Sequence, residues 1–282
     1  MKKQLVAPLM LAALGSAPAH SQSTGEGEKG KFTVTPALVS DYYWRGQNQH
    51  LNIGSPAFQP TIGYEKGPWS FDLGISVPLN DKFPSDNGEK SKKLKMSDTI
   101  YPEIDLSASY EFSFANDCFK IKPGILAYTY MTADDSGSTE SDSDDFFKAV
   151  FEPTVSFAFA AKDFSLSLNL YYDVIQKGPT YEVEAGYTIP ITEQIGVELS
   201  AMAGKFDLAD SVPNSEQKEK FSGSYWQAGI SVPIELTEKM AIVPGWYYAK
   251  GYGRTYQTGN DLKVSSPDEG RGVFSLSFSY TF

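Results

Sequence analysis

The last nine residues of the chain alternate strictly between two kinds of side chain. From Phe274 to Phe282 every even position is large and apolar, and every odd position from Ser275 to Thr281 carries a hydroxyl. Because successive side chains of a strand point to opposite faces, this segment has one apolar face and one polar face. Ending on the aromatic Phe282, the pattern is typical of the closing strand of a membrane-spanning barrel, with lipid outside and water inside.

The beginning of the chain has the three parts of an export signal. Met1-Lys2-Lys3 is positively charged, residues 5–14 form an apolar run, and Ala17-Pro18-Ala19 has the small-x-small form of a cleavage site. The apolar run is too short for a membrane-spanning helix. We therefore expect residues 1–19 to be a cleaved signal peptide, residues 20–31 a short flexible periplasmic leader, and residues 32–282 the barrel.

Composition excludes several classes of protein. The formal net charge of -11 argues against a nucleic-acid partner, because nucleic acids bind basic surfaces. The single cysteine, Cys118, cannot form an internal disulfide. No apolar stretch reaches the length of a membrane helix, whereas a barrel needs only alternate apolar residues. The aromatic content of 14% favours strands over helices.

Strand-like segments recur along the whole chain and predict a single all-β domain, an antiparallel up-and-down transmembrane barrel of about 12 strands. An even number of strands places both termini on the periplasmic side. The expected segments are 32–46, 55–65, 68–79, 99–114, 118–131, 146–160, 164–176, 180–190, 194–205, 223–236, 240–252 and 271–282.

The connections between these segments alternate in length. Tight turns are expected at 66–68, 116–117, 162–163, 192–193 and 237–239, and longer polar connections at 47–54, 80–98, 132–145, 206–222 and 253–270. Residues 177–179 are the exception, a short turn where a long one is due. Membrane barrels have short periplasmic turns and longer outer loops, so this order supports the barrel.

The polar faces of the predicted strands give the residues that line the pore. Acids outnumber bases on these faces, and charges inside a pore favour ions of the opposite sign, which predicts a mild preference for cations. An alternative is that acids and bases pair across a narrow barrel and plug it. The pore-lining candidates are Arg45, Asp72, Glu103, Asp105, Glu111, Lys120, Lys122, Lys148, Glu152, Asp173, Glu182, Glu184 and Glu198.

Aromatic residues fall near the two ends of the predicted strands, as interfacial anchors do. Several tyrosines, including Tyr128, Tyr171 and Tyr247, lie toward the outer ends by this ordering. The candidates for membrane-interface aromatics are Tyr42, Trp44, Trp69, Trp226, Trp246 and Phe282.

The sequence gives little support to catalysis, a cofactor or a metal site. Only His50 could serve a mature enzyme as a base, with Ser40 and Asp41 upstream of it as possible partners. This trio is the basis for a third alternative, an outer-membrane hydrolase. The acidic segment 134–145 lacks the calcium-loop pattern, and we expect a solvated outer loop there, with weak calcium or magnesium contact as the minor alternative.

Residues 39–49, Val-Ser-Asp-Tyr-Tyr-Trp-Arg-Gly-Gln-Asn-Gln, resemble the opening strand of the TorF-type porins, a family of outer-membrane barrels. The resemblance implies an outer-membrane channel and names no catalytic residue. Within this segment, strand alternation predicts that Tyr42 and Trp44 face lipid, while Asp41 and Arg45 point inward, where they could pair.

Together these features predict a porin-like channel in a Gram-negative-type outer membrane for passive diffusion of small hydrophilic solutes or ions. The expected partners are membrane lipid, lipopolysaccharide and the barrel-assembly machinery, which would engage the last strand ending at Phe282. A plugged barrel, structural or binding through its outer loops, is the first alternative. The sequence leaves the oligomeric state and the solute open.

Overall fold

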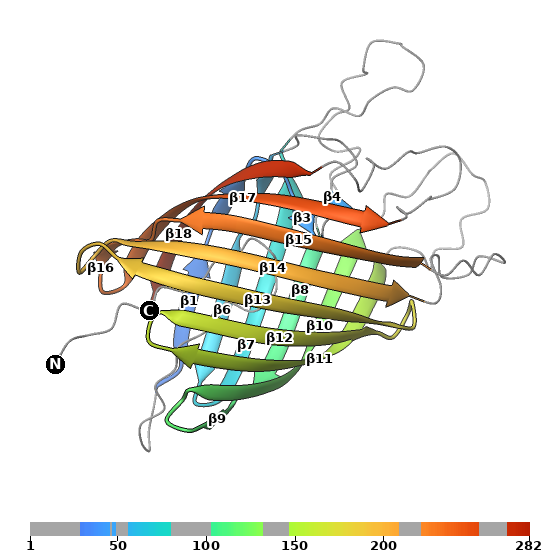
Figure 1. The fold of residues 1–282 in the computed structure, drawn as a ribbon, viewed down its shortest axis with the longest axis horizontal. Coiled ribbons are helices and arrows are strands. Elements are labelled where there is room, and N and C mark those ends of the chain that lie inside the picture. The colour runs from blue at the N-terminus through green and yellow to red at the C-terminus, as the bar shows by residue number, and fades with distance from the viewer. Residues whose placement is uncertain are drawn as a thin grey trace, which may run out of the picture.

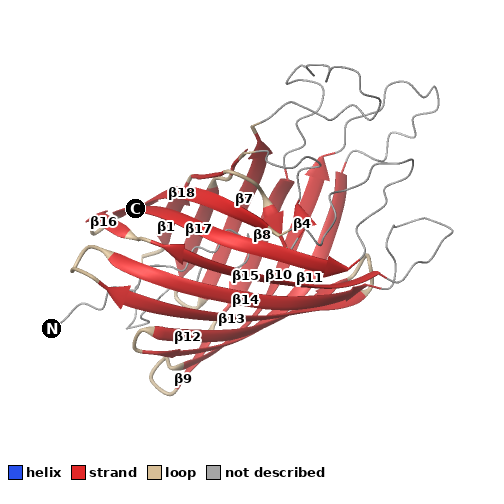
Figure 2. Cartoon of the chain, turned by 45° about the horizontal axis from the view of Figure 1, so that its top comes forward, coloured by secondary structure: helices blue, strands red, loops and turns tan. Residues whose placement is uncertain are grey.

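The computed structural model describes residues 29–45, 47–48, 56–79, 103–131, 147–208, 221–253 and 270–282. Its described residues form strands joined by turns, and Figure 2 shows no helix among them. Accordingly, no helix of this part of the chain is long and apolar enough to cross a membrane.

Figure 1 shows the strands wrapped around a single interior. They are β1 (Lys31–Thr35), β2 (Ala37–Val39), β3 (Tyr43–Trp44), β4 (Gln47–Asn48), β5 (Ala57–Phe58), β6 (Thr61–Lys66), β7 (Trp69–Pro78), β8 (Glu103–Tyr110), β9 (Phe112–Phe114), β10 (Phe119–Met131), β11 (Phe147–Ala161), β12 (Phe164–Asp173), β13 (Gly178–Pro190), β14 (Gly196–Leu208), β15 (Phe221–Ser231), β16 (Ile234–Thr237), β17 (Met240–Gly253) and β18 (Arg271–Thr281).

These strands make a closed antiparallel barrel of 12 strands, as the sequence predicts. Four barrel strands are each interrupted once, as β1–β2, β5–β6, β8–β9 and β15–β16. Proline explains three of the breaks, at Pro36, Pro60 and Pro233, because it has no N–H for the ladder. The barrel closes where β18 pairs with both β1 and β2.

Short turns join the strands at one end of the barrel. β6 passes to β7 through Gly67, whose φ of 57° suits glycine, and β11 passes to β12 through Lys162 and Asp163. The C-terminus lies at this end, because Phe282 N–H donates to the Phe32 carbonyl and Thr281 N–H donates to the Lys239 carbonyl in the β16–β17 turn. This arrangement is that of the predicted periplasmic side.

At the opposite end, the β12–β13 connection is short, as the sequence indicates. Asp173 closes it by accepting hydrogen bonds from the N–H groups of Ile175 and Gln176 at 2.8 and 2.7 Å. Gly178 follows, and a Cβ there would lie 2.1 Å from the Asp207 carbonyl oxygen on β14. Only glycine therefore allows β13 and β14 to approach so closely.

The two faces of the wall differ sharply in polarity. On β12, Leu166 and Leu168 are about 40% exposed on the outer face of the wall. Asn169, on the opposite face, is only 3% exposed and lies inside the barrel. On β18, Phe274 and Leu276 point outward and Ser277 inward. A water-soluble sheet protein buries its apolar face, so this inverted arrangement makes an exterior suited to hydrocarbon.

Candidate functional site

The chain leaves the wall after Val39 and returns to it at Ala57. Between these points β3 and β4 pair with each other, Tyr43 with Asn48 and Trp44 with Gln47, and form a two-stranded sheet separate from that of the barrel. The sequence predicts one wall strand over 32–46, and this is wrong beyond Val39. The residues after it fold into the interior as a hairpin, which we call the inner hairpin (residues 40–48 where described).

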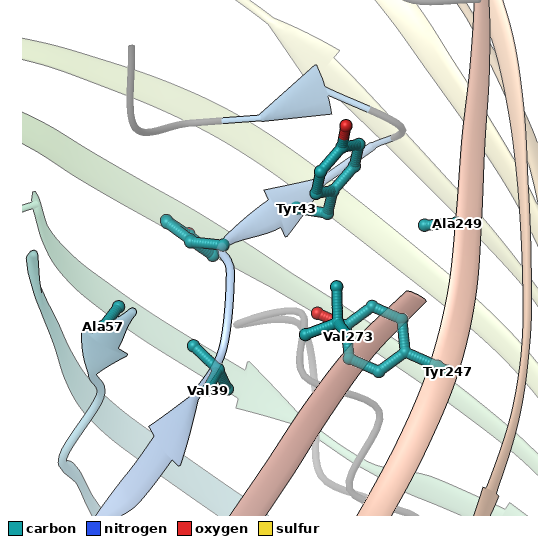
Figure 3. Close-up of a cluster of buried hydrophobic side chains, with 7 residues drawn as sticks. Val39, Tyr43, Ala57, Tyr247, Ala249 and Val273 are labelled. Carbon is teal, nitrogen blue, oxygen red and sulfur yellow. The ribbon is translucent and has the colours of Figure 1, made fainter. Parts of the chain in front are cut away.

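The base of the inner hairpin is fixed to the wall near the barrel closure. Ser40 N–H donates to the Phe274 carbonyl at 2.8 Å, and Phe274 N–H donates to Ser40 Oγ at 2.9 Å. Tyr42 and Tyr43 pack in a buried cluster against the inner faces of β17 and β18, as Figure 3 shows for Tyr43, Tyr247 and Val273.

Two predicted interface aromatics therefore lie inside the barrel rather than against lipid. Tyr42 is only 2% exposed in this cluster. The Trp44 ring lies edge-on to Tyr128, with 5.1 Å between ring centroids, and carries the Arg45 guanidinium over its face. The lipid-facing assignment fails because it assumes a continuous wall strand, whereas this segment has left the wall.

Arg45 forms the tip of the inner hairpin and reaches the far wall. Its Nη1 and Nη2 donate to the two oxygens of Glu152 at 2.8 and 2.7 Å, and its Nε lies 3.9 Å from Glu182. Glu152 is on β11, and β5, β7, β8 and β10 lie between β2 and β11 in the wall. The hairpin therefore spans the interior and is held there by a two-pronged ion pair.

Aromatic residues complete the surroundings of this guanidinium. The ring centroids of Trp44 and Tyr171 lie 4.2 and 4.6 Å from its central carbon, at cation–π distance. The Tyr128 hydroxyl donates to Glu152 at 2.9 Å, and the Tyr225 hydroxyl donates to Glu182 at 2.5 Å. We call the wall residues Tyr128, Glu152, Tyr171, Glu182 and Tyr225 the clamp pocket.

Arg45 and Asp41, which alternation would allow to pair, have other partners. Asp41 instead accepts a hydrogen bond from Tyr42 N–H at 3.0 Å and lies 3.9 Å from Arg271 on β18. Asp41 therefore belongs to the base of the inner hairpin, while Arg45 belongs to its tip.

A second charged group lies toward the end of the barrel with the short turns. Glu111 accepts a hydrogen bond from Lys120 Nζ at 2.7 Å, and its other carboxylate oxygen lies 3.6 Å from Lys122 Nζ. All three side chains are largely buried. Asp72 on β7 accepts from Ser107 at 3.1 Å. Two of the three lysines predicted to line the pore, Lys120 and Lys122, are thus already paired with an acid.

The other predicted pore-lining acids are spread over the inner face of the wall. Glu103 and Asp105 are buried together on β8, and Asp105 Oδ2 has no hydrogen-bond partner in the described part of the chain. Glu184 accepts from Ser167 at 3.4 Å, and Glu198 accepts from Ser231 at 3.0 Å. Asp173 closes the β12–β13 turn, and the Lys148 side chain lies outside the described residues.

The remaining predicted interface aromatics are on the outside. Trp69, Trp226, Trp246 and Phe282 are among the exposed large apolar residues of the outer face. Trp69 stacks on Phe71 and meets Tyr110 edge-on, beside the short β6–β7 turn. Their placement at a membrane interface stays a prediction.

The alternative hydrolase site falls largely outside the described residues. His50 and the acidic segment 134–145 are not described, and Ser40 Oγ accepts the Phe274 N–H that anchors the inner hairpin. Cys118 is half-buried in the β9–β10 turn. No group of three or more potential metal ligands occurs within the described ranges.

Part of this chain matches a known family. Residues 119–265 match the model of the family described as "Putative MetA-pathway of phenol degradation", which covers more than half of the sequence. The chain belongs to this family. The match begins at Phe119 and does not include residues 39–49, so their resemblance to the TorF-type porins stays a prediction.

Solved structures show the same fold at low sequence identity. A COG4313 outer membrane channel from Pseudomonas putida F1 has a TM-score of 0.54 and 8% identity, with 96% of this chain and 100% of that chain covered. A KdgM porin has a TM-score of 0.51 and 8% identity, with coverage of 89% and 99%. No curated protein matches the sequence.

Sequence reasoning found the acids of the clamp pocket but missed its tyrosines and the inner hairpin. The sequence prediction places Tyr128 and Tyr171 by their height along the strands, and height does not tell which face of the wall a side chain lies on. Alternation gives it, because Tyr171 has the same parity as the buried Asn169 and Tyr128 the same parity as Lys120 and Lys122. No comparable signal marks residues 40–48 as leaving the wall.

Proposed function

We propose that this protein is an outer-membrane channel that lets small hydrophilic solutes or ions diffuse passively, with a mild preference for cations. The observation that carries the proposal is the inverted polarity of the closed barrel, apolar outside and charged inside. An apolar exterior buries itself in lipid, and an interior lined with carboxylates is suited to water and cations.

The cation preference rests on the balance of charge on the inner face. Lys120 and Lys122 share Glu111, whereas Asp105, Glu184 and Glu198 have no described lysine or arginine within ion-pair distance. A permeating cation would meet unneutralised carboxylates, and an anion would meet repulsion. Proteins of the same fold are named as an outer membrane channel and a porin, which fits this proposal.

A plugged barrel is the second candidate, and the inner hairpin is the observation that favours it. Arg45 holds the hairpin tip against the far wall, so the interior is at least narrowed where the clamp pocket lies. Narrowing by an inward segment is compatible with conduction, whereas full closure is not.

A solute-flux assay on refolded protein in liposomes separates the two candidates. Liposomes loaded with a dextran too large for the barrel and diluted into an isosmotic solution of a small sugar swell only when that sugar enters. We expect swelling that becomes slower as the sugar becomes larger. Swelling no faster than in protein-free liposomes, with folded barrels present, would contradict the channel and support the plug.

A further inference from the structure

The clamp pocket has the chemistry of a receptor for a guanidinium group, and the only guanidinium that the structure places there belongs to the chain itself. We propose that the clamp pocket is a binding site for small guanidinium-bearing solutes and that Arg45 occupies it as an internal stand-in. This inference rests on the proposed channel function and names the class of solute that the channel would recognise.

The first support is the match of shape and donors. A guanidinium is flat and carries N–H donors in a fork, and Glu152 accepts two of them side by side at 2.8 and 2.7 Å. The Tyr171 ring covers one face of the group at 4.6 Å. Lysine-type ammonium ions would fit less well, because they have no planar fork and no face to stack.

The second support is the imbalance of charge around Arg45. Glu152 and Glu182 both lie within 4.0 Å of one guanidinium, and both are almost fully buried. Lys120 and Lys122 pair with Glu111, and Arg271 lies beside Asp41. Removal of Arg45 would leave two buried carboxylates without a cation, so hairpin release is strongly disfavoured unless another cation takes its place.

The third support is that Arg45 does not make all the hydrogen bonds that its guanidinium could make in the clamp pocket. Its Nε is buried, has no hydrogen-bond partner among the described residues, and stops 3.9 Å short of Glu182. Arg45 also holds a left-handed φ of 49°, a conformation that residues other than glycine disfavour. A free guanidinium ion is not tied to a backbone, so it can move to bond both carboxylates.

These features couple solute binding to hairpin position. Solute and Arg45 compete for the same acceptors, so a bound solute favours the state in which the hairpin tip has left the far wall. By the same linkage, a pocket freed of Arg45 binds the solute more tightly. An Arg45 occupancy of only about nine-tenths already means that its removal strengthens binding about tenfold, and a higher occupancy strengthens it more.

Titration calorimetry with methylguanidinium chloride tests the proposal on the full-length refolded barrel in detergent at constant ionic strength. We expect Arg45→Ala to bind methylguanidinium about tenfold or more tightly than wild type does. Adding Glu152→Gln to Arg45→Ala should abolish that gain. Lys122→Ala is the matched control, because it also removes an inward cation yet should leave the affinity at the wild-type value.

Equal affinity of Arg45→Ala and wild type, or a gain that survives Glu152→Gln, would overturn the proposal. A gain of the same size in Lys122→Ala would overturn it too, because it would show that net charge alone attracts the ion.

A second measurement on the wild-type protein keeps the test decisive if Arg45→Ala does not fold. Trp44 stacks on Arg45, so displacement of Arg45 should change the Trp44 fluorescence. We expect methylguanidinium to change the emission, tetramethylammonium to leave it unchanged, and Trp44→Phe to lose the response. An identical response to both ions, or none to methylguanidinium, would overturn the proposal.

The outcomes separate this site from the channel itself. Barrels that bind methylguanidinium as expected but admit no solute into liposomes would refute the channel and keep the site. Barrels that admit solutes but bind methylguanidinium no better without Arg45 would keep the channel and refute the site.

Discussion

At the residue scale, one arginine organises the interior. Arg45 joins the inner hairpin to β11 through Glu152, and its guanidinium stacks against Trp44 and Tyr171. Breaking a buried ion pair by removing one charge is far costlier than the net worth of the pair, because the other charge stays buried and uncompensated. The Arg45–Glu152 ion pair should therefore contribute more to the stability of the barrel interior than the other charged contacts there.

Replacing Glu152 by glutamine tests this dominance. Glu152→Gln should lower the free energy of unfolding by about 3–5 kcal/mol, because Arg45 loses its main counter-charge in a buried place. Urea unfolding of the refolded barrel, followed by tryptophan fluorescence, measures the change. Glu184→Gln is the matched control, since that carboxylate accepts a long hydrogen bond from Ser167 at 3.4 Å, and it should cost less than about 1 kcal/mol.

At the element scale, the strands follow from alternation and the inner hairpin does not. Segments such as β12 and β18 carry apolar residues at every second position, so their boundaries and faces can be read directly from the sequence. The segment after Val39 alternates poorly, because Ser40-Asp41 is followed by three aromatic residues, and taking it as a wall strand makes Tyr42 and Trp44 apparent outward residues. Its true position depends on a long-range contact, Arg45 with Glu152, which local pattern cannot reveal.

The close approach of β13 and β14 gives a prediction about one glycine. Gly178→Ala should destabilise the barrel by about 2 kcal/mol or more, because the new Cβ would overlap the Asp207 carbonyl carbon and oxygen. Gly196→Ala, on β14 at the other end of the same strand pair, is the control. The nearest atoms to a Cβ there lie at 3.6 Å or more, so its cost should stay below about 1 kcal/mol. Equal urea midpoints for the two variants would contradict this packing.

At the scale of the whole molecule, the fold is predictable because the strands share one pattern. Their apolar side chains point outward and their polar side chains point inward, the reverse of a water-soluble protein. The sequence has twelve strand-like segments, and the connections between them alternate in length. These two features predict a closed barrel without any knowledge of long-range contacts. The contents of the interior are less predictable, because they depend on which side chains meet across the barrel. The faces of Asp72, Glu111 and Glu184 can be read from alternation, whereas the pairing of Lys120 with Glu111 cannot.

The outward apolar face gives a prediction for the barrel in lipid. Leu168→Arg should lower the stability of the barrel in phospholipid vesicles by about 2–4 kcal/mol, because it places a charge among acyl chains in mid-strand. Ser167→Arg, the next residue but on the inner face, should cost far less, because Glu184 lies beside it. Urea titration of vesicle-bound protein compares the two. A smaller cost for Leu168→Arg than for Ser167→Arg would show that the faces are assigned the wrong way round.

Single-channel current across a planar bilayer under a salt gradient tests the central claim most directly, with wild type and Arg45→Ala side by side. We predict stable current steps in wild type, a reversal potential that makes the dilute side positive, and larger steps in Arg45→Ala because the hairpin tip is no longer held across the interior. Lys122→Ala should keep the wild-type step size. A complete lack of steps in both wild type and Arg45→Ala, with the barrels correctly folded, would contradict the channel, and a negative dilute side would contradict the cation preference.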